Sequence, residues 1–421
     1  MEYTLKRSRV CLAGRFNAKK GLTPEDLNPT DWKRITMSKS DYEAMKGHYF
    51  QSFLRSMLEV ADVEKQVVCR YEMVFPKQFD QLMALVAEAG TQTSYPCKIN
   101  NIRLWFFPYD MVLFSIDIEE FPESFSNLTL MHRKWKAWQS NYNEFHTKEL
   151  DEMLRPLAQL TPSQCPSQIT YSGTKIRQYQ AIEIDITNGD SETVTIKDDL
   201  LYELGTFSDI GIVEDKDPKK SFKPSTDYYN QIIRENTLSV FSNWKALALN
   251  DSFTVLTIDD FFIKKEFEEN FELLYMRCLF EEFYCFDRNN LYREKKETDI
   301  DSKGIETEIS YMEQHYFYDE FCFDFNTPLM YQAMAKGLEL QKDREQLTQH
   351  VKQALRDARQ ERNNSAVNFV QIFAVFSVIW TIHAMLIDGT CSAFFSLLVA
   401  LLITALLLKR PQLLTRLLQN N

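Results

Sequence analysis

The chain has 421 residues, of which 44% are apolar and 26% charged, and its formal net charge is −12 at pH 7. This length allows two or three domains with a sizeable buried core. The negative charge argues against nucleic-acid binding as the main function, so no direct nucleic-acid partner is expected. The eight cysteines form no CxxC pair, so the sequence indicates neither a zinc site nor a disulfide framework.

Residues 1–258 carry both strand and helix patterns, which predict a cytosolic domain of mixed α and β structure. Pro108-Tyr109-Asp110 lies between two strand-like runs and predicts a hairpin, as does Asn188-Gly189. The predicted strands are 66–74, 102–107, 111–118, 181–187, 193–197 and 252–258. The predicted helices are about 39–63, 79–89 and 126–155.

Residues 259–365 predict a helical region, with helices at about 259–286 and 305–325. Thr327-Pro328 is typical of a helix start. From there an unbroken stalk helix is expected to Ile387, about 90 Å long at 1.5 Å per residue. The acidic segment 266–320 either concentrates divalent cations such as Mg²⁺ or is a solvated helical face.

Two apolar stretches follow, Ala366–Ile387 and Cys391–Leu408, separated by Asp388-Gly389-Thr390. Because about 20 apolar residues cross a bilayer as a helix, they predict a transmembrane hairpin, with a tail at 409–421. Basic residues flank the pair and are absent from its link, so both termini are expected in the cytoplasm of a multi-pass inner-membrane protein. These basic residues are Lys352, Arg356, Arg359, Arg362, Lys409, Arg410 and Arg416.

One face of the first stretch is polar at its start and apolar further along. Rings of Asn and Gln followed by Val and Ile are typical of a pore with a hydrophobic gate, and Asp388 is then expected at the outer mouth. The alternative is that these amides form hydrogen bonds between packed helices. The face consists of Asn364, Asn368, Gln371, Val375, Val378 and Ile382. Since two spans cannot enclose a pore, a cyclic homo-oligomer of three to five subunits is expected.

This layout resembles the CorA family of divalent-cation channels: an α+β domain, a long stalk helix, a pore-lining span, a short loop, an outer span and a basic tail. The family's Gly-Met-Asn signature is missing, and Ile387-Asp388-Gly389-Thr390 stands in its place. CorA-like proteins without that signature include effectors of type III CRISPR systems. Resemblance to this group implies a channel gated in antiviral defence by a nucleotide messenger, an S-adenosylmethionine–AMP conjugate.

A nucleotide would need cations and aromatic rings in a pocket of the cytosolic domain. The candidates lie where the predicted strands meet the first long helix: Arg103, Trp105, Lys134, Lys136 and Arg155. No motif of a known enzyme class occurs, so a non-enzymatic function is expected. Two alternatives remain open: a Mg²⁺ transporter of the CorA family, and a membrane-anchored binding or scaffold protein.

Overall fold

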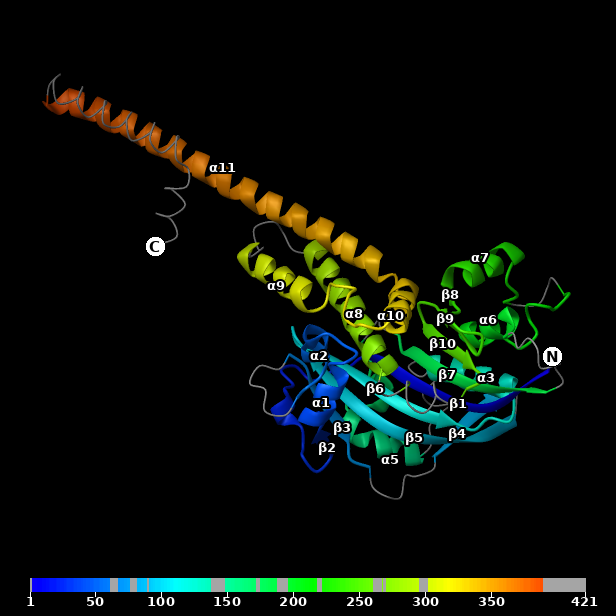
Figure 1. The fold of residues 1–421 in the computed structure, drawn as a ribbon. Helices are drawn as coiled ribbons and strands as arrows, with labels where there is room; N and C mark the ends of the chain where they lie inside the picture. The colour runs from blue at the N-terminus through cyan, green and yellow to red at the C-terminus, as the bar shows by residue number, and fades with distance from the viewer. Residues whose placement is uncertain are drawn as a thin grey trace. The chain divides into compact units, whose positions relative to one another are not determined.

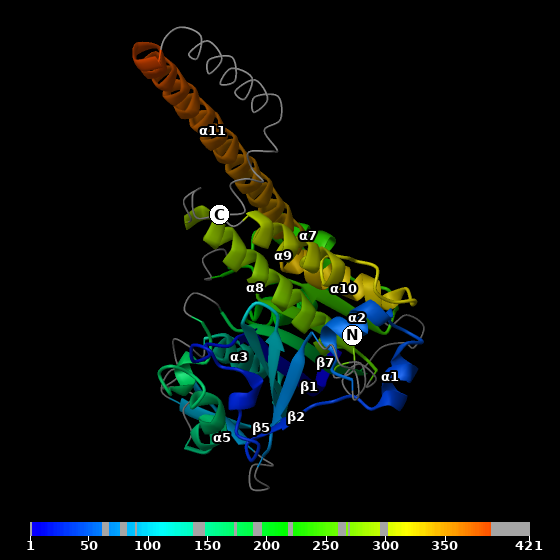
Figure 2. The ribbon, with the colours of Figure 1, turned by 90° about the vertical axis from the view of Figure 1, so that its left-hand side faces the viewer.

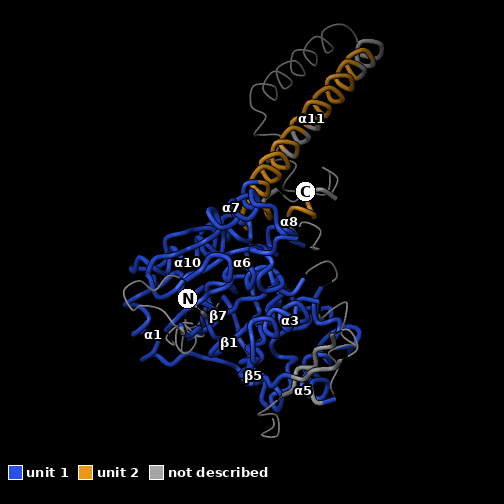
Figure 3. Tube along the Cα trace, turned by 90° about the vertical axis from the view of Figure 1, so that its right-hand side faces the viewer, with its two compact units in different colours: residues 1–287, 309–345 blue, residues 288–308, 346–421 orange. Residues whose placement is uncertain are grey.

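The structure is a computed structural model. It describes residues 2–60, 67–75, 82–88, 91–137, 148–171, 175–187, 196–217, 222–259, 267, 270–294 and 302–388. The chain forms two compact units, coloured separately in Figure 3. Unit 1 comprises residues 1–287 and 309–345, and unit 2 comprises residues 288–308 and 346–421.

Unit 1 is built around a ten-stranded mixed sheet with the strand order β2-β3-β5-β6-β1-β7-β10-β9-β8, and β4 pairs with β5 beside this path. All neighbouring strands are antiparallel except β7 and β10, which run parallel. The strands are β1 (Glu2–Arg15), β2 (Trp32–Arg34), β3 (Cys69–Met73), β4 (Leu82–Glu88), β5 (Thr91–Phe107), β6 (Met111–Glu120), β7 (Arg177–Thr187), β8 (Thr237–Leu238), β9 (Trp244–Ala248) and β10 (Ser252–Thr257).

The helices begin with side-chain caps where the sequence supplies serine. Ser38, Ser124 and Ser225 each accept a hydrogen bond from a backbone N–H in the first turn of the helix that follows. The helices are α1 (Lys39–Met45), α2 (Gln51–Met57), α3 (Phe125–Lys136), α5 (Lys148–Ala158), α6 (Asp198–Thr206), α7 (Thr226–Asn236), α8 (Glu272–Glu294), α9 (Ser302–His315), α10 (Asn326–Gly337) and α11 (Leu340–Asp388).

One face of the sheet carries the apolar core. Alternate residues of β1, β5 and β6, such as Leu12, Leu104 and Ile116, pack against α3 and α5. A second cluster lies beside it, where Ile182 and Ile184 of β7 pack with leucines of α6. Figures 1 and 2 show the sheet between these helices and α8.

The other face of the sheet meets the part of α8 up to Asp287 and is rich in buried charges. Arg103, Arg177 and Arg15 on the sheet pair with Glu272, Glu282 and Asp287 of α8, respectively. Rings fill the space between these pairs, and the Phe107 and Phe280 rings stack with centroids 4.4 Å apart. The acidic residues of α8 therefore neutralise the arginines of the sheet, and Glu281 and Glu282 are buried rather than solvated.

Several predicted elements are confirmed. The predicted hairpin at 102–118 is formed by β5 and β6, which pair Phe107 with Met111 across the three-residue loop Pro108-Tyr109-Asp110. Tyr109 and Asp110 both have positive φ, 63° and 56°. Strands were also correctly predicted at β3, β7 and β10. The predicted Asn188-Gly189 turn and its second strand, 193–195 included, lie outside the described residues.

Other expectations were wrong. Residues 82–88, expected in a helix, form β4 along the edge of β5, so pairing with a neighbour overrides the local pattern. The helix predicted at 39–63 is two short helices, α1 and α2. The predicted stalk helix is also interrupted. Leu338 and Glu339 separate α10 from α11, and Glu339 has a φ of 56°.

The predicted CorA-like fold with a transmembrane hairpin is contradicted. Within the described part of the chain, no helix is both long and apolar enough to cross a membrane. The stretch Ala366–Ile387 belongs to α11, where polar side chains such as Asn368 and Gln371 are exposed, and polar groups are costly inside a bilayer. The second stretch, Cys391–Leu408, lies outside the described residues. The predictions of a membrane channel and of an inner-membrane location are corrected by the same finding.

All six residues of the predicted pore face lie on α11 and are exposed. Val375, Val378 and Ile382 are 60%, 50% and 54% exposed, respectively. Asn364, Asn368 and Gln371 are also exposed. Asp388 is the last residue of α11. The predicted pore depended on a membrane span, so the described residues give it no support. The observed feature is an exposed helix face that is polar at its start and apolar further along.

Candidate ligand-binding site

A cavity of about 230 Å³ lies in unit 1 where β7 begins, next to the turn between β9 and β10. These elements, with α8 and α11, are labelled in Figure 1. The lining residues come from all of them: Lys175, Arg177, Asn250, Asp251, Glu282, Phe283, Phe286 and Asp343. The cavity is thus formed by one end of the sheet, the middle of α8 and the first turn of α11.

Arg177 is the central cation of this site. Its Nη1 donates to Asp251 Oδ1 at 3.0 Å, and its Nη2 donates to Glu282 Oε1 at 2.5 Å. Lys136 of α3 approaches the other oxygen of Asp251, with Nζ 2.5 Å from Oδ2. Asp251 therefore holds Lys136 and Arg177 side by side at the end of the sheet.

Two buried polar atoms of the cavity lack hydrogen-bond partners among the described residues. They are Arg177 Nε, a donor, and Glu282 Oε2, an acceptor. Arg177 is 9% exposed and Glu282 is 8% exposed. Buried polar groups in native proteins are nearly always satisfied, so a donor and an acceptor without partners beside one cavity are a binding-site signal.

Burial and the neighbouring charges shift the pKa values of the cavity's carboxyl groups in different directions. Burial raises the pKa of Glu282, against the effect of the Arg177 charge. Burial alone would also raise the pKa of Asp251, but the hydrogen bond and charge of Lys136 and the charge of Arg177 lower it overall. Burial likewise raises the pKa of Asp343. The ionised form of Asp251 is therefore stabilised, whereas burial destabilises the ionised forms of Glu282 and Asp343.

Aromatic surface adjoins these charges. Phe283 is buried, but Phe286, also on α8, keeps 52% of its surface exposed at the cavity. Lys175 is exposed at the same rim. An exposed ring beside an exposed ammonium group can stack on a planar ligand while the cation binds an anionic group of that ligand.

The five residues predicted to bind a ligand are not brought together. Arg103 and Trp105 of β5 lie on the face that meets α8, where Arg103 pairs with Glu72 and Glu272. Trp105 is fully buried and its Nε1 donates to Ser115 Oγ at 3.1 Å. Both side chains are therefore committed to internal contacts.

The other three predicted residues lie on helices of the opposite face. Lys134 and Lys136 are on α3, and Arg155 is exposed on α5. Of the five, Lys136 is the one that reaches the cavity, through Asp251. The prediction of a cationic ligand site on the α/β unit thus included one neighbouring residue but missed the residues that line it.

The sequence contains weak indications of the lining residues that were not predicted. Lys175 and Arg177 stand two apart at the start of an alternating strand, so they lie on the same side of the backbone. Glu282 belongs to the acidic segment that was weighed as a solvated face. Since burial depends on which face of α8 meets the sheet, sequence alone could not separate Glu282 from the other acidic residues.

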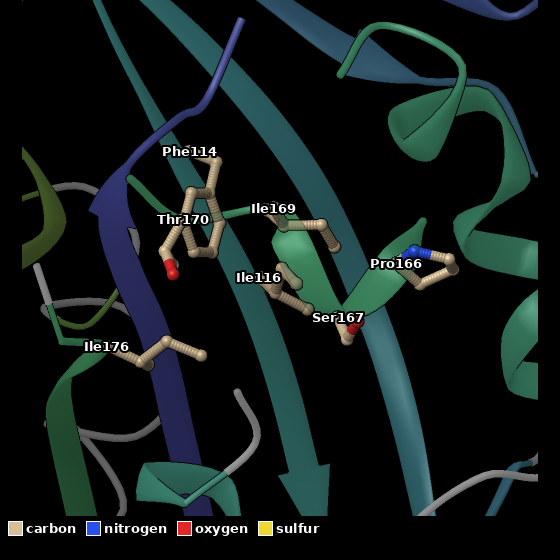
Figure 4. A pocket seen from close by; sticks show the side chains of 7 residues that line it. All are labelled: Phe114, Ile116, Pro166, Ser167, Ile169, Thr170 and Ile176. Atoms are coloured by element: carbon tan, nitrogen blue, oxygen red, sulfur yellow. The ribbon is translucent and has the colours of Figure 1, made fainter. Parts of the chain in front are cut away.

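A second hollow lies against the core face of the sheet and is shown in Figure 4. Its volume is about 10 Å³, which holds at most a single water molecule. Its lining is nearly all apolar and includes Phe114, Ile116 and Ile169. This hollow is a packing defect of the core rather than a ligand site.

Metal ligands do not gather in the part of the chain that the structure describes, where no group of three or more His, Cys, Asp or Glu side chains could hold an ion. Comparisons with protein-family models, with curated proteins and with solved structures give no match. The resemblance to CorA-type effectors therefore stays a prediction from the sequence.

Proposed function

We propose that this protein is a nucleotide-binding protein without catalytic activity of its own, which binds its ligand in the cavity at Arg177 and assembles with copies of itself. The observation that carries the proposal is the pair of buried, unpartnered atoms, Arg177 Nε and Glu282 Oε2, beside an exposed cation and an exposed ring. The resemblance to type III CRISPR effectors makes the S-adenosylmethionine–AMP conjugate the first ligand to test.

The chemistry of the cavity supports such a ligand. Phe286 offers a ring for a nucleobase, and Lys175 with Arg177 offers donors for a phosphate. Glu282 Oε2 is free to accept a hydrogen bond from an exocyclic amino group. The cavity also contains carboxylates, so a ligand that carries a positive group as well as a phosphate suits it better than a pure polyanion.

Calorimetric titration tests the ligand. The conjugate is titrated into the full chain, with AMP and S-adenosylmethionine as separate probes. Lys175→Met and Phe286→Ala change exposed side chains, and each is expected to weaken binding about tenfold or more. A charge-assisted hydrogen bond from Lys175 contributes about 1.5–3 kcal/mol, and stacking of a base on the Phe286 ring about 1–3 kcal/mol. Lys98→Met, at an exposed position of β5 outside the cavity, should bind as the wild type does. Absence of binding by all three probes would contradict the proposal.

Self-assembly is supported by α11. Eight large apolar side chains of its C-terminal half are exposed by 45% or more. They are Val367, Phe369, Ile372, Val375, Phe376, Val378, Trp380 and Ile382. At 100° per residue they form two groups around the helix, Val367, Val375, Val378 and Ile382 on one side and Phe369, Ile372, Phe376 and Trp380 on the other. Exposed apolar surface of this extent marks an interaction surface.

We propose that the side with Val375, Val378 and Ile382 packs against the same side of a second copy. Asn364, Asn368 and Gln371 share the face with Val375 and Val378, as the helical periodicity places them. Identical helices in register would bring like amides together, and an amide both donates and accepts hydrogen bonds. Polar residues within an apolar seam are a known device for fixing register and subunit number.

A further inference from the structure

The turn of α8 that forms one wall of the cavity also anchors the start of α11. Glu282 faces the cavity and pairs with Arg177. Its neighbour Glu281 is fully buried and binds Arg344 of α11. Two consecutive carboxylates of one helix thus hold two different partners, one at the ligand site and one on α11.

Several hydrogen bonds surround Glu281 and anchor the start of α11. Glu281 Oε1 accepts hydrogen bonds from Tyr331 Oη and Arg277 Nε, each at 3.1 Å. Arg344 Nη2 also donates to Tyr331 Oη at 2.7 Å, and its Nη1 donates to Asp319 at 3.3 Å. Arg277, fully buried among aromatic rings, additionally donates to two backbone carbonyls. Arg344 therefore ties α11 to the buried side chains of Glu281, Arg277 and Tyr331.

The residue before Arg344 belongs to the cavity. Asp343 lies in the first turn of α11 and lines the cavity opposite Glu282, whose carboxyl group is close enough for the Asp343 charge to influence its pKa. The position of Asp343 depends on how the first turn of α11 is held. Since Arg344 is the adjacent residue, its contact with Glu281 sets that position.

A joint precedes this turn. Glu339 separates α10 from α11 with a φ of 56°, a left-handed conformation that non-glycine residues rarely adopt. Glu339 lines a groove of about 820 Å³ together with residues of α10 and α11. Side-chain contacts hold α11 on one side of this break. A small shift of α11 would therefore be taken up by a change of the backbone at Glu339.

We propose that Arg344 is a positioning residue for the ligand site, which couples occupancy of the cavity to the conformation of the α10–α11 joint. This inference rests on the proposed function for its ligand, but its mechanical part is independent of ligand identity. A ligand that replaces the Arg177–Glu282 contact shifts the α8 turn and, through Glu281 and Arg344, the start of α11.

The mechanical part is tested without ligand. Hydrogen exchange of the backbone amides of residues 338–345 is measured in the full chain and in Glu282→Gln. The variant is expected to exchange faster there, on the order of fivefold, while the amides of β1 keep their protection. Asp117→Asn disrupts a comparable buried pair with Arg9 and is the matched control, with no change expected at 338–345. An unchanged joint in Glu282→Gln overturns the coupling.

The ligand part is tested by titration of the S-adenosylmethionine–AMP conjugate into Arg344→Met and Arg344→Lys. The methionine variant is expected to bind about tenfold more weakly. The lysine variant should recover part of this loss, which a merely unfolded protein would not do. Lys352→Met, at an exposed position further along α11 that lines neither the cavity nor the groove at the joint, serves as the control.

The exchange experiment and the titration distinguish a wrong ligand from a wrong role of Arg344. If the wild-type chain binds no conjugate, the proposed ligand is wrong, and the exchange result still decides whether the cavity and the joint are coupled. If the conjugate binds but Arg344→Met binds equally well, the proposed ligand stands and the positioning role of Arg344 is wrong.

Discussion

At the scale of single residues, this protein buries many charges and satisfies most of them with specific partners. Glu120 is fully buried and serves three donors. Its Oε2 accepts from Ser8 Oγ at 3.0 Å and is 2.7 Å from His132 Nε2, while its Oε1 accepts from Trp135 Nε1 at 2.9 Å. One carboxylate thus connects β1 and β6 with α3.

Replacing Glu120 with Ala is expected to lower the free energy of unfolding by about 3 kcal/mol or more, since several buried polar groups lose their partner at once. Glu120→Gln keeps one acceptor and should lose less. Urea unfolding followed by circular dichroism measures both. Glu119→Ala, at the neighbouring and partly exposed position, should change stability by less than about 1 kcal/mol. Equal effects of the two alanine variants would contradict this role of Glu120.

At the scale of elements, close packing decides where α10 ends and how it approaches the sheet. A Cβ atom on Gly337 would lie 2.9 Å from the backbone carbon of Ala248 and 3.0 Å from the nitrogen of Leu249. The last turn of α10 therefore touches the backbone of β9 directly. Only glycine allows this approach, and the chain then reverses through Leu338 and Glu339 into α11.

Gly337→Ala is expected to lower the free energy of unfolding by about 1–3 kcal/mol, although alanine is the better helix former. The reason is that the added methyl group meets backbone atoms, which cannot move aside as a side chain can. The measurement is the urea midpoint. Gly47→Ala is the control, because its Cβ would approach only one atom, at 3.3 Å, and it should cost clearly less. A more stable Gly337→Ala would show that α10 shifts freely against β9.

At the scale of the whole molecule, the exposed apolar side chains of α11 have the largest consequence for assembly. A helix of 49 residues is about 74 Å long, and its C-terminal half shows apolar side chains that nothing within the described chain covers. The net charge of −12 opposes non-specific association between copies. An apolar face on such a chain therefore favours a specific assembly over general aggregation.

Val375→Asp is expected to shift the sedimentation coefficient of the full chain to that of a single copy, because facing copies would bury like charges in an apolar seam. Sedimentation velocity over a range of protein concentrations makes the measurement. Gln353→Asp, on an exposed position of the same helix outside the apolar face, should leave the assembly intact. A wild-type chain that sediments as a single copy at all concentrations would rule out the proposed assembly.

The strands of the mixed sheet could be predicted from the sequence only in part. The runs that became β6, β7 and β10 are β-branched and apolar, so they were found from the sequence. The central strand β1 was missed, because Lys6, Arg7 and Arg9 break its pattern. Those charges are tolerated there because Glu183 and Asp117 on the neighbouring strands neutralise them.

The sequence by itself determined the local structure that depends on neighbouring residues: the loop Pro108-Tyr109-Asp110 between β5 and β6, the serine caps and the helical character of the second half. The tertiary structure decided the rest. Which carboxylates of α8 are buried, where α10 gives way to α11, and which cations line the cavity all depend on faces that meet across the fold. Arg177, Glu282 and Asp343 come from three distant segments, and only packing of α8 and α11 on the end of the sheet brings them to one site.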